Sequence, residues 1–416
     1  MIILNSFGSN NHFLRERIIG KIIMLPYFLA SIFYRLSNGC LILAFSWLML
    51  NAFIDGEKKL FWIILTSFLP ALIVAPIINF ISNYFNVISI IVFGCLCIKL
   101  SVILIIIFNN YLYLLVSLNL FLWCIFFVLE SSWEAWFTEI SKSIRDDKIK
   151  QKFNSMTLTC SQAALMIGPL LVSPGMRINS KYGPFYISII LYFVTILLLI
   201  YSRFINNKKF IIKNFSNEKN ISIKSIINKL PSINIFLILI LIWPVLGMIN
   251  MVLPIIGKNR LGGKVEYVAY LDFSIGLGMA ISGILLSFFA AKYFFNYKGL
   301  SVLSILGFLS ITSFCLFFNN LYILFILIFL FGMSFGGIRI IIRKYLVDFL
   351  TPSEVAKLIG SANAIGFPVV TLFSFLYSTS SKSELFPLLV FIMFILFAFI
   401  FSYNLGRKSE NNIFKN

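Results

Sequence analysis

The sequence predicts an all-α integral membrane protein, with about twelve transmembrane helices in two pseudo-symmetric six-helix bundles. Three observations lead to this fold class: the composition, the spacing of the apolar runs and an internal repeat. Of the 416 residues, 60% are hydrophobic and only 12% are charged, whereas a soluble domain is about 45–50% apolar and about 25% charged. So few charges cannot cover a surface that faces water, and we therefore expect the chain to face lipid.

Apolar runs long enough to cross a bilayer recur along the chain, since about 20 mostly apolar residues make one spanning helix. The first set is expected near residues 26–50, 60–81, 86–108, 111–135, 155–174 and 183–202. The second set is expected near 232–254, 268–291, 299–318, 321–343, 357–378 and 385–404. The first run follows some twenty polar and basic residues and lacks a small-residue cleavage site, so it is not a signal peptide. We predict an N-terminal bundle (1–202), a basic cytoplasmic linker (203–231) and a C-terminal bundle (232–416).

The lysines and arginines orient these spans. With a cytoplasmic N-terminus, the inner loops and tails hold about three times as many Lys and Arg residues as the outer loops, which agrees with the positive-inside rule. We therefore expect a protein of the bacterial plasma or inner membrane, with both termini on the cytoplasmic side. The net charge of +19 is spread between apolar runs, which favours contact with anionic lipid over nucleic acid.

Several chemistries have no residues to support them. The six cysteines lie within apolar spans without disulfide or zinc spacing, and the only histidine, His12, lies in the polar N-terminal tail. We expect no metal and no cofactor. The chain has no phosphate-binding loop of an ATP-driven pump and no recognisable catalytic cluster, so we do not expect an enzyme.

An internal repeat supports the two bundles. Aligning Tyr84-Phe85 with Tyr293-Phe294 gives an offset of 209, and Glu139 and Asp348 differ by the same offset. "SQAALMIGP" in the fifth span then matches "SANAIGFP" in the eleventh, where Pro169 and Pro368 are 199 apart. Three matches in the same order indicate a duplicated six-helix unit.

Three stretches resemble the major facilitator superfamily, and within it the drug:proton antiporter branch that includes macrolide efflux proteins and siderophore exporters. "RLSNGCLILAFSWLM" (35–49) resembles the first-helix pattern of that branch, and "GPLLVSPG" (168–175) resembles its fifth-helix antiporter motif. The third stretch is "FGMSFGGIRIIIRKYLVDFLTPSEVAKLIGSANAIG" (331–366), which resembles the segment from helix ten through the next loop. The resemblance covers nearly the whole chain and implies the fold predicted above.

The chain departs from the branch at two acids. Asn38 stands where the branch usually has Asp in helix one, which puts the usual proton site in doubt. Asn83 replaces the Asp of the loop between helices two and three, which puts the usual gating motif, here Asn83, Glu139 and Asp348, in doubt.

The antiporter-like motif places Gly168 and Pro169 inside an apolar span, where a proline kink is tolerated if neighbouring groups satisfy the freed carbonyl. With Ala163 and Ala164, Gly168 forms a plausible close-packing face. This helix is either a merely kinked structural helix or one that packs against the other half and rocks with it.

Charged residues inside spans are costly and are normally paired or face a wet cavity. Glu130 and Glu134 share one helix face, and two like charges at this spacing should favour protonation of at least one carboxyl. We hypothesise that they form a proton-sensitive pair with Arg35 as counter-charge; alternatively, both lie near the cytoplasmic interface and reach water. Asp272 is a further coupling candidate, although an interfacial cap is the simpler interpretation.

Other residues have similar alternatives. Structural pairing is the safer interpretation of Lys99. Arg339 and Arg343 could attract an anionic substrate or, more simply, anchor the span at the cytoplasmic surface. Trp133 and Trp136 could stack a planar ligand or line the interface.

The resemblance implies a secondary active transporter, with proton-coupled efflux of a small amphipathic compound (an antibiotic, a siderophore or a peptide-like toxin) by alternating access. Its partners would be this small-molecule substrate, protons as coupling ion and the lipid bilayer, and we expect a monomer. Two alternatives remain open: an importer of a nutrient or peptide on the same fold, and a non-transporting receptor or immunity protein. The Gly168-Pro169 motif argues mildly against the importer, while Asn38 and Asn83 are the changes that lost coupling would leave.

Overall fold

The computed structural model describes residues 12–52, 65–144, 147–206, 222–259, 261–288, 297–316 and 320–379, which form helices joined by short turns, with no strand among them. The first half contains α1 (His12–Ala52), α3 (Ala71–Tyr84), α4 (Val87–Ile107), α5 (Leu112–Ser143), α6 (Asp147–Ile167), the 3₁₀ turn η3 (Gly168–Leu171), α7 (Val172–Ile178) and α8 (Gly183–Asn206). The second half contains α9 (Ile223–Lys229), α10 (Ile233–Asn259), α11 (Val265–Phe288), α12 (Tyr297–Leu316), α13 (Leu321–Phe349) and α14 (Pro352–Thr379).

A described helix lies in every predicted span except the last, 385–404, which lies outside the described residues, as do residues 60–64, 289–291 and 317–318 of three other spans. Eight of them are long and apolar enough to cross a membrane by themselves. The second span is made of a short apolar helix, Leu65–Val74, that overlaps α3 around Pro70. Side-chain amides begin two of the helices: Asn86 accepts from the Ser89 N–H at the start of α4, and Asn320 caps α13.

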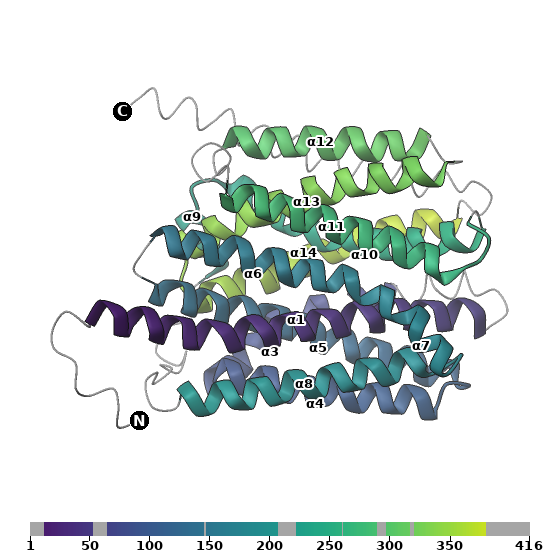
Figure 1. The fold of residues 1–416 in the computed structure, drawn as a ribbon, viewed down its shortest axis with the longest axis horizontal. Coiled ribbons are helices and arrows are strands. Elements are labelled where there is room, and N and C mark those ends of the chain that lie inside the picture. Colours follow the sequence, from purple (N-terminus) through teal and green to yellow (C-terminus); the bar gives the residue numbers. More distant parts are fainter. Residues whose placement is uncertain are drawn as a thin grey trace.

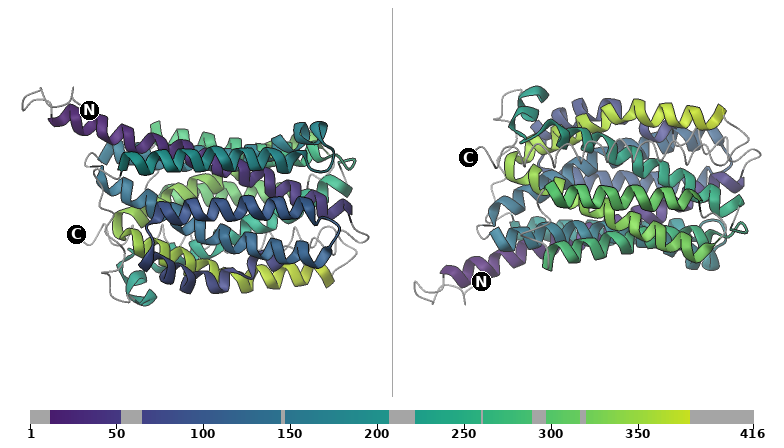
Figure 2. Two further views of the ribbon diagram at one scale, coloured as in Figure 1. Left: turned by 90° about the horizontal axis from the view of Figure 1, so that it is seen from below. Right: turned by 90° about the horizontal axis from the view of Figure 1, so that it is seen from above.

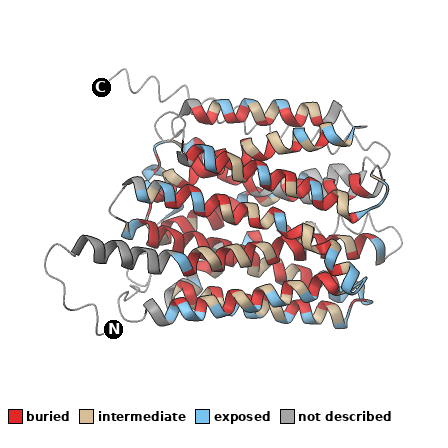
Figure 3. Cartoon of the chain, in the orientation of Figure 1, coloured by how far each residue is buried: buried red, intermediate tan, exposed pale blue. Residues whose placement is uncertain are grey.

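The outer faces of the bundle are apolar, as lipid requires. On α4, Phe93, Leu96, Leu100 and Ile107 are all exposed, and exposed residues mark the outermost helices while the inner ones are mostly buried (Figure 3). A soluble monomer rarely exposes apolar patches of this extent. Composition and structure therefore agree on a membrane protein.

The two halves lie side by side, with α4 and α8 at one edge of the molecule and α12 at the other (Figure 1). The views of Figure 2 show the long helices running roughly parallel across the whole bundle. Contact between the halves comes chiefly from α6 against α11, and from α14 against α3 and α5. Since α6 and α14 are the fifth and eleventh spans, these contacts agree with the predicted repeat.

The Gly168-Pro169 stretch locally tightens a long span without ending it. Pro169 sits in η3, and the helical path continues directly into α7. A methyl group added to Gly168 would lie 2.7 Å from the Cys40 amide nitrogen and 2.8 Å from the Gly39 Cα atom, so this glycine packs on the backbone of α1. Close packing by small residues is thus present, but Gly168 makes it within its own half, while α6 as a whole packs on α11 of the other half.

Candidate functional site

Five charged side chains meet in the interior between the two halves, and we call them the charge network. Arg35 comes from α1, Glu130 and Glu134 from α5, and Arg339 and Arg343 from α13; all five residues are buried. The two glutamates of α5 and the two arginines of α13 lie past the midpoints of these helices, toward the end of the molecule at which α1 begins (Figure 1), and we call this end the N-terminal end. Buried charges of this kind persist only when they are paired.

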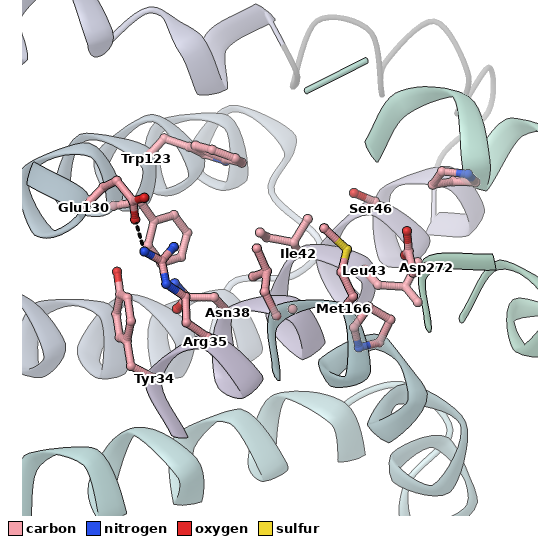
Figure 4. Close-up of a pocket in the computed structure, with 15 residues that line it drawn as sticks. Tyr34, Arg35, Asn38, Ile42, Leu43, Ser46, Trp123, Glu130, Met166 and Asp272 are labelled. Atoms are coloured by element: carbon pink, nitrogen blue, oxygen red, sulfur yellow. Dashed lines mark hydrogen bonds and ion pairs between the residues drawn. The ribbon is translucent and has the colours of Figure 1, made fainter. Parts of the chain in front are cut away.

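The pairs within the network are direct. The Arg35 guanidinium donates to Glu130 (Figure 4) and forms an ion pair with it. The Arg343 Nε atom donates to the Glu134 Oε2 atom at 2.7 Å, and the guanidinium lies 3.4 Å from the centre of the Phe137 ring. Arg339 is 3.7 Å from the other carboxylate oxygen of Glu130 and donates to Gln162 on α6 at 2.5 Å. The pair of Arg35 with Glu130 lies within one half, whereas the contacts of Arg339 and Arg343 cross between halves.

The crossing pairs follow the internal repeat. Glu134 and Arg343 are 209 residues apart, and Glu130 and Arg339 have the same separation. This is the offset that the sequence repeat predicts. Each of the two network glutamates on α5, Glu130 and Glu134, therefore faces its own counterpart in the second half, where the charge is reversed.

A cavity extends from the network, and we call it the central cavity; its empty space, counted together with the part open to solvent, is about 750 Å³. Charged side chains stand at its two ends, with Arg35 and Glu130 at one and Asp272 of α11 at the other (Figure 4). Between them the lining is apolar and aromatic, with few polar groups: Asn38, Gly39, Ile42, Leu43, Ser46, Trp123, Phe126, Leu165, Met166 and Pro169.

Asp272 differs from the other acids of the site. It is 7% exposed, and its Oδ1 atom is buried without a hydrogen-bond partner in the described part of the chain. It makes no ion pair with another described residue. An interfacial cap would be wet and hydrogen-bonded, so that interpretation is wrong for Asp272.

A second cavity borders the network beside α10 and α14, and its empty space, counted together with the part open to solvent, is about 480 Å³. Arg339, Arg343 and Asn363 line it. Among the described residues, the Arg343 Nη1 and Asn363 Nδ2 atoms find no partner. Arg343 of the network, and Asn363 beside it, therefore each present a donor group to this cavity without a partner among the described residues.

The predicted gating residues lie apart from the central cavity. Asp348, at the end of α13, accepts from Lys150 of α6 at 2.9 Å and so links the two halves near the N-terminal end. Glu139 is half-buried and lies in the last turns of α5, near the same N-terminal end of the molecule. Asn83 lies in the last turn of α3, and its side chain is outside the described part of the structure.

Several sequence interpretations are corrected by burial and pairing. Glu130 and Glu134 do not reach water at an interface, because both are buried and bound to guanidinium groups. Arg339 and Arg343 are not surface anchors but members of the network. The i, i+4 arginine pair at the repeat offset from the i, i+4 glutamate pair is the signal that could have found them.

Two more predictions concern aromatic and amide groups. Trp133 and Trp136 neither line the interface nor border either cavity; both are buried and pack against Tyr27. Asn38, in place of the usual acid, accepts from the Tyr192 hydroxyl at 2.5 Å and faces the central cavity. Lys99 lies 5.1 Å from the centre of the Phe193 ring, in keeping with a structural role.

Two helical bundles around an internal, largely apolar cavity with charged side chains at its ends are the architecture of a membrane transporter. The family model of the Major Facilitator Superfamily matches residues 27–374, and the chain belongs to that superfamily. Among curated proteins nothing matches.

Solved structures share the fold at low sequence identity. The human organic anion transporter MFSD10 (TETRAN) is 11% identical with a TM-score of 0.63, over 93% of this chain and 99% of that one. A bacterial homologue of the iron transporter ferroportin, in its outward-facing state, is 12% identical with a TM-score of 0.69, over 92% of this chain and 99% of that one. Similarity at this level shows the fold alone.

Proposed function

We propose that the protein exports a small amphipathic compound in exchange for protons, by alternating access of the central cavity to the two sides of the membrane. The observation that carries this proposal is Asp272, a buried carboxyl that has no ion-pair partner among the described residues and lies at one end of a largely apolar cavity. An unpaired carboxylate at membrane depth is costly, so the group favours a proton or a cationic partner. The Asp272 carboxyl can bind a proton or a cationic group of the substrate, but not both at once. Such competition is the basis for exchanging protons for substrate across the membrane.

The charge network supports the alternating-access part of the proposal. Glu134 with Arg343, Glu130 with Arg339, and Lys150 with Asp348 join the two halves at the N-terminal end. These contacts must break before the cavity can open at that end. In this proposal Glu130 keeps Arg35 as a partner in its own half, while Glu134 loses its counter-charge and is the carboxyl that protonation would release.

Efflux is favoured by the resemblance of Gly168-Pro169 to the antiporter motif of exporters, together with the backbone contact that Gly168 makes with α1. This contact fixes the fifth span next to the helix that carries Arg35 and Asn38. An exporter is therefore proposed ahead of an importer or a non-transporting receptor.

Inverted membrane vesicles with an acid interior test direction and coupling together. We expect gradient-dependent uptake of at least one compound from a panel of amphipathic antibiotics, siderophores and small peptides. Asp272→Asn should abolish the gradient dependence, whereas Glu266→Gln, which changes an acid in the first turn of the same helix, should keep it. Uptake by no compound would favour the receptor or immunity protein, and gradient-driven accumulation only in right-side-out vesicles would indicate an importer.

A further inference from the structure

Ionisable groups of opposite sign stand at the two ends of the central cavity. The charge network counts three guanidinium groups against two carboxylates, an excess of one positive charge; Arg35 and Glu130 line the central cavity, and Arg339 and Arg343 line the second one. At the other end of the central cavity, Asp272 is a carboxyl without an ion-pair partner among the described residues. Ionised, these groups would leave one uncompensated charge of each sign at opposite ends of one cavity (Figure 4).

The lining between the two ends of the cavity strengthens the electrostatic interactions of the groups at its ends. Ile42, Leu43, Trp123, Phe126 and Met166 provide an apolar and aromatic lining between the ends. In such surroundings charges interact more strongly than in water. A neutral ligand would leave both ends uncompensated, and a simple ion would compensate only one.

The length of the cavity limits the length of a ligand that reaches both ends. Arg35 and Ser46 line opposite ends of it on α1 (Figure 4), and the eleven-residue rise between them is about 16 Å. An extended peptide spans about 3.3–3.6 Å per residue. Three residues, with one hydrogen bond of about 3 Å at each end, account for this distance.

We propose that the transported compound is an amphipathic zwitterion about as long as a tripeptide, held with its ammonium group at Asp272 and its carboxylate at Arg35. A guanidinium has five N–H donors, so Arg35 can hold Glu130 and a substrate carboxylate together. The apolar lining receives the middle of the molecule. This assignment rests on the proposed function, since the ammonium group takes the place of the proton on Asp272.

The test is a set of peptides that differ only at their ends. Ala-Phe-Ala, its N-acetyl form, its C-terminal amide and the doubly blocked form are bound to the purified full-length protein at neutral pH. Tryptophan fluorescence reports binding, because Trp123 lines the cavity. Each block should weaken binding at least about tenfold, the usual worth of a hydrogen-bonded charged group. Equal binding of all four forms, or dependence on one end only, would overturn the proposal.

Variants then assign each end to its residue. In Asp272→Asn the free and N-acetyl peptides should bind equally, while the preference for a free carboxylate persists. In Arg35→Gln the free and amidated peptides should bind equally, while the preference for a free amine persists. Glu266→Gln and Lys99→Gln remove charges on α11 and α4 that do not line the cavity and should change neither ratio.

Ratios between two ligands on one protein are insensitive to a general loss of folded protein. If Arg35→Gln does not fold, Arg35→Lys replaces it and should reduce the preference for a free carboxylate, because a lysine lacks the fork of parallel donors. An unchanged preference would exclude Arg35 and overturn the assignment.

Binding and transport separate this inference from the proposed function. If the peptides bind with the expected ratios but no gradient drives any compound, the proposed function fails and the zwitterion site stands. If another compound is exported at the expense of protons and the peptides do not compete with it, the function stands and the zwitterion site is wrong.

Discussion

The Arg35–Glu130 pair shows how one side chain can decide the charge of the whole interior. Glu130 contacts both Arg35 and Arg339, so removing Arg35 leaves it one partner, and the network becomes neutral. Removing Glu130 instead leaves three guanidinium groups with a single carboxylate. Breaking a buried pair typically costs about 3–5 kcal/mol because the remaining charge is uncompensated.

We therefore predict that Glu130→Gln destabilises the protein more than Arg35→Gln does. Thermal unfolding of the purified protein in detergent should give a lower midpoint for Glu130→Gln. The double variant, which carries two arginines and one glutamate, should recover part of the loss. Equal midpoints for the two single variants would show that the excess positive charge of the network does not affect the stability of the protein.

At the level of elements, α1 and the fifth span approach through glycines. A Cβ atom on Gly168 would lie 2.7 Å from a backbone nitrogen of α1, and one on Gly39 would lie 2.9 Å from the Leu165 carbonyl carbon. Backbone cannot yield as a flexible side chain can, and overpacking costs typically about 1–3 kcal/mol. We predict that Gly168→Ala and Gly39→Ala each lower the unfolding midpoint, whereas Ser180→Ala in the exposed turn after α7 does not.

Two of the ion pairs that join α13 to the first half should differ in how much they stabilise the closed N-terminal end. Lys150 and Asp348 are both partly exposed, and pairs of this kind are worth about 0–1 kcal/mol. The buried pair of Glu134 and Arg343 should hold the N-terminal end closed more firmly. We predict that Lys150→Gln with Asp348→Asn barely changes labelling of an introduced cysteine in the central cavity from that end, while Glu134→Gln with Arg343→Gln increases it severalfold.

The double variant of Glu134 and Arg343 keeps the excess of one positive charge in the network. A change in labelling is therefore due to the lost pair and not to a changed net charge. If both double variants label at the same rate, the network does not close this end.

At the scale of the whole molecule, the sequence-derived topology still has to be tested. We predict that single cysteines introduced in the linker Asn206–Lys229 and in both tails are labelled from the cytoplasmic side. The positive-inside bias is the physical reason. Labelling of the linker from the opposite side would contradict the orientation, and alternating access would then need another topology.

The fold could be predicted because it depends on composition and period, which the sequence carries directly. Too few charges, apolar runs of spanning length and an offset of 209 residues led to two bundles, and family membership and the described helices agree. The site was harder to predict because pairing between halves is a tertiary property. Burial distinguishes Arg339 from a surface anchor, and only the packing of α11 places Asp272 at the cavity.

Reversed charge at repeat-equivalent positions has a consequence for how the protein arose. Two identical six-helix units would place like residues opposite each other at these positions, acid against acid or guanidinium against guanidinium. In such a homodimer, like charges on the two units would repel each other at the positions where this chain forms ion pairs. The pairs of Glu130 with Arg339 and Glu134 with Arg343 could therefore form only after the duplicated units were free to diverge, and they make each unit a partner for the other and a poor partner for its own kind.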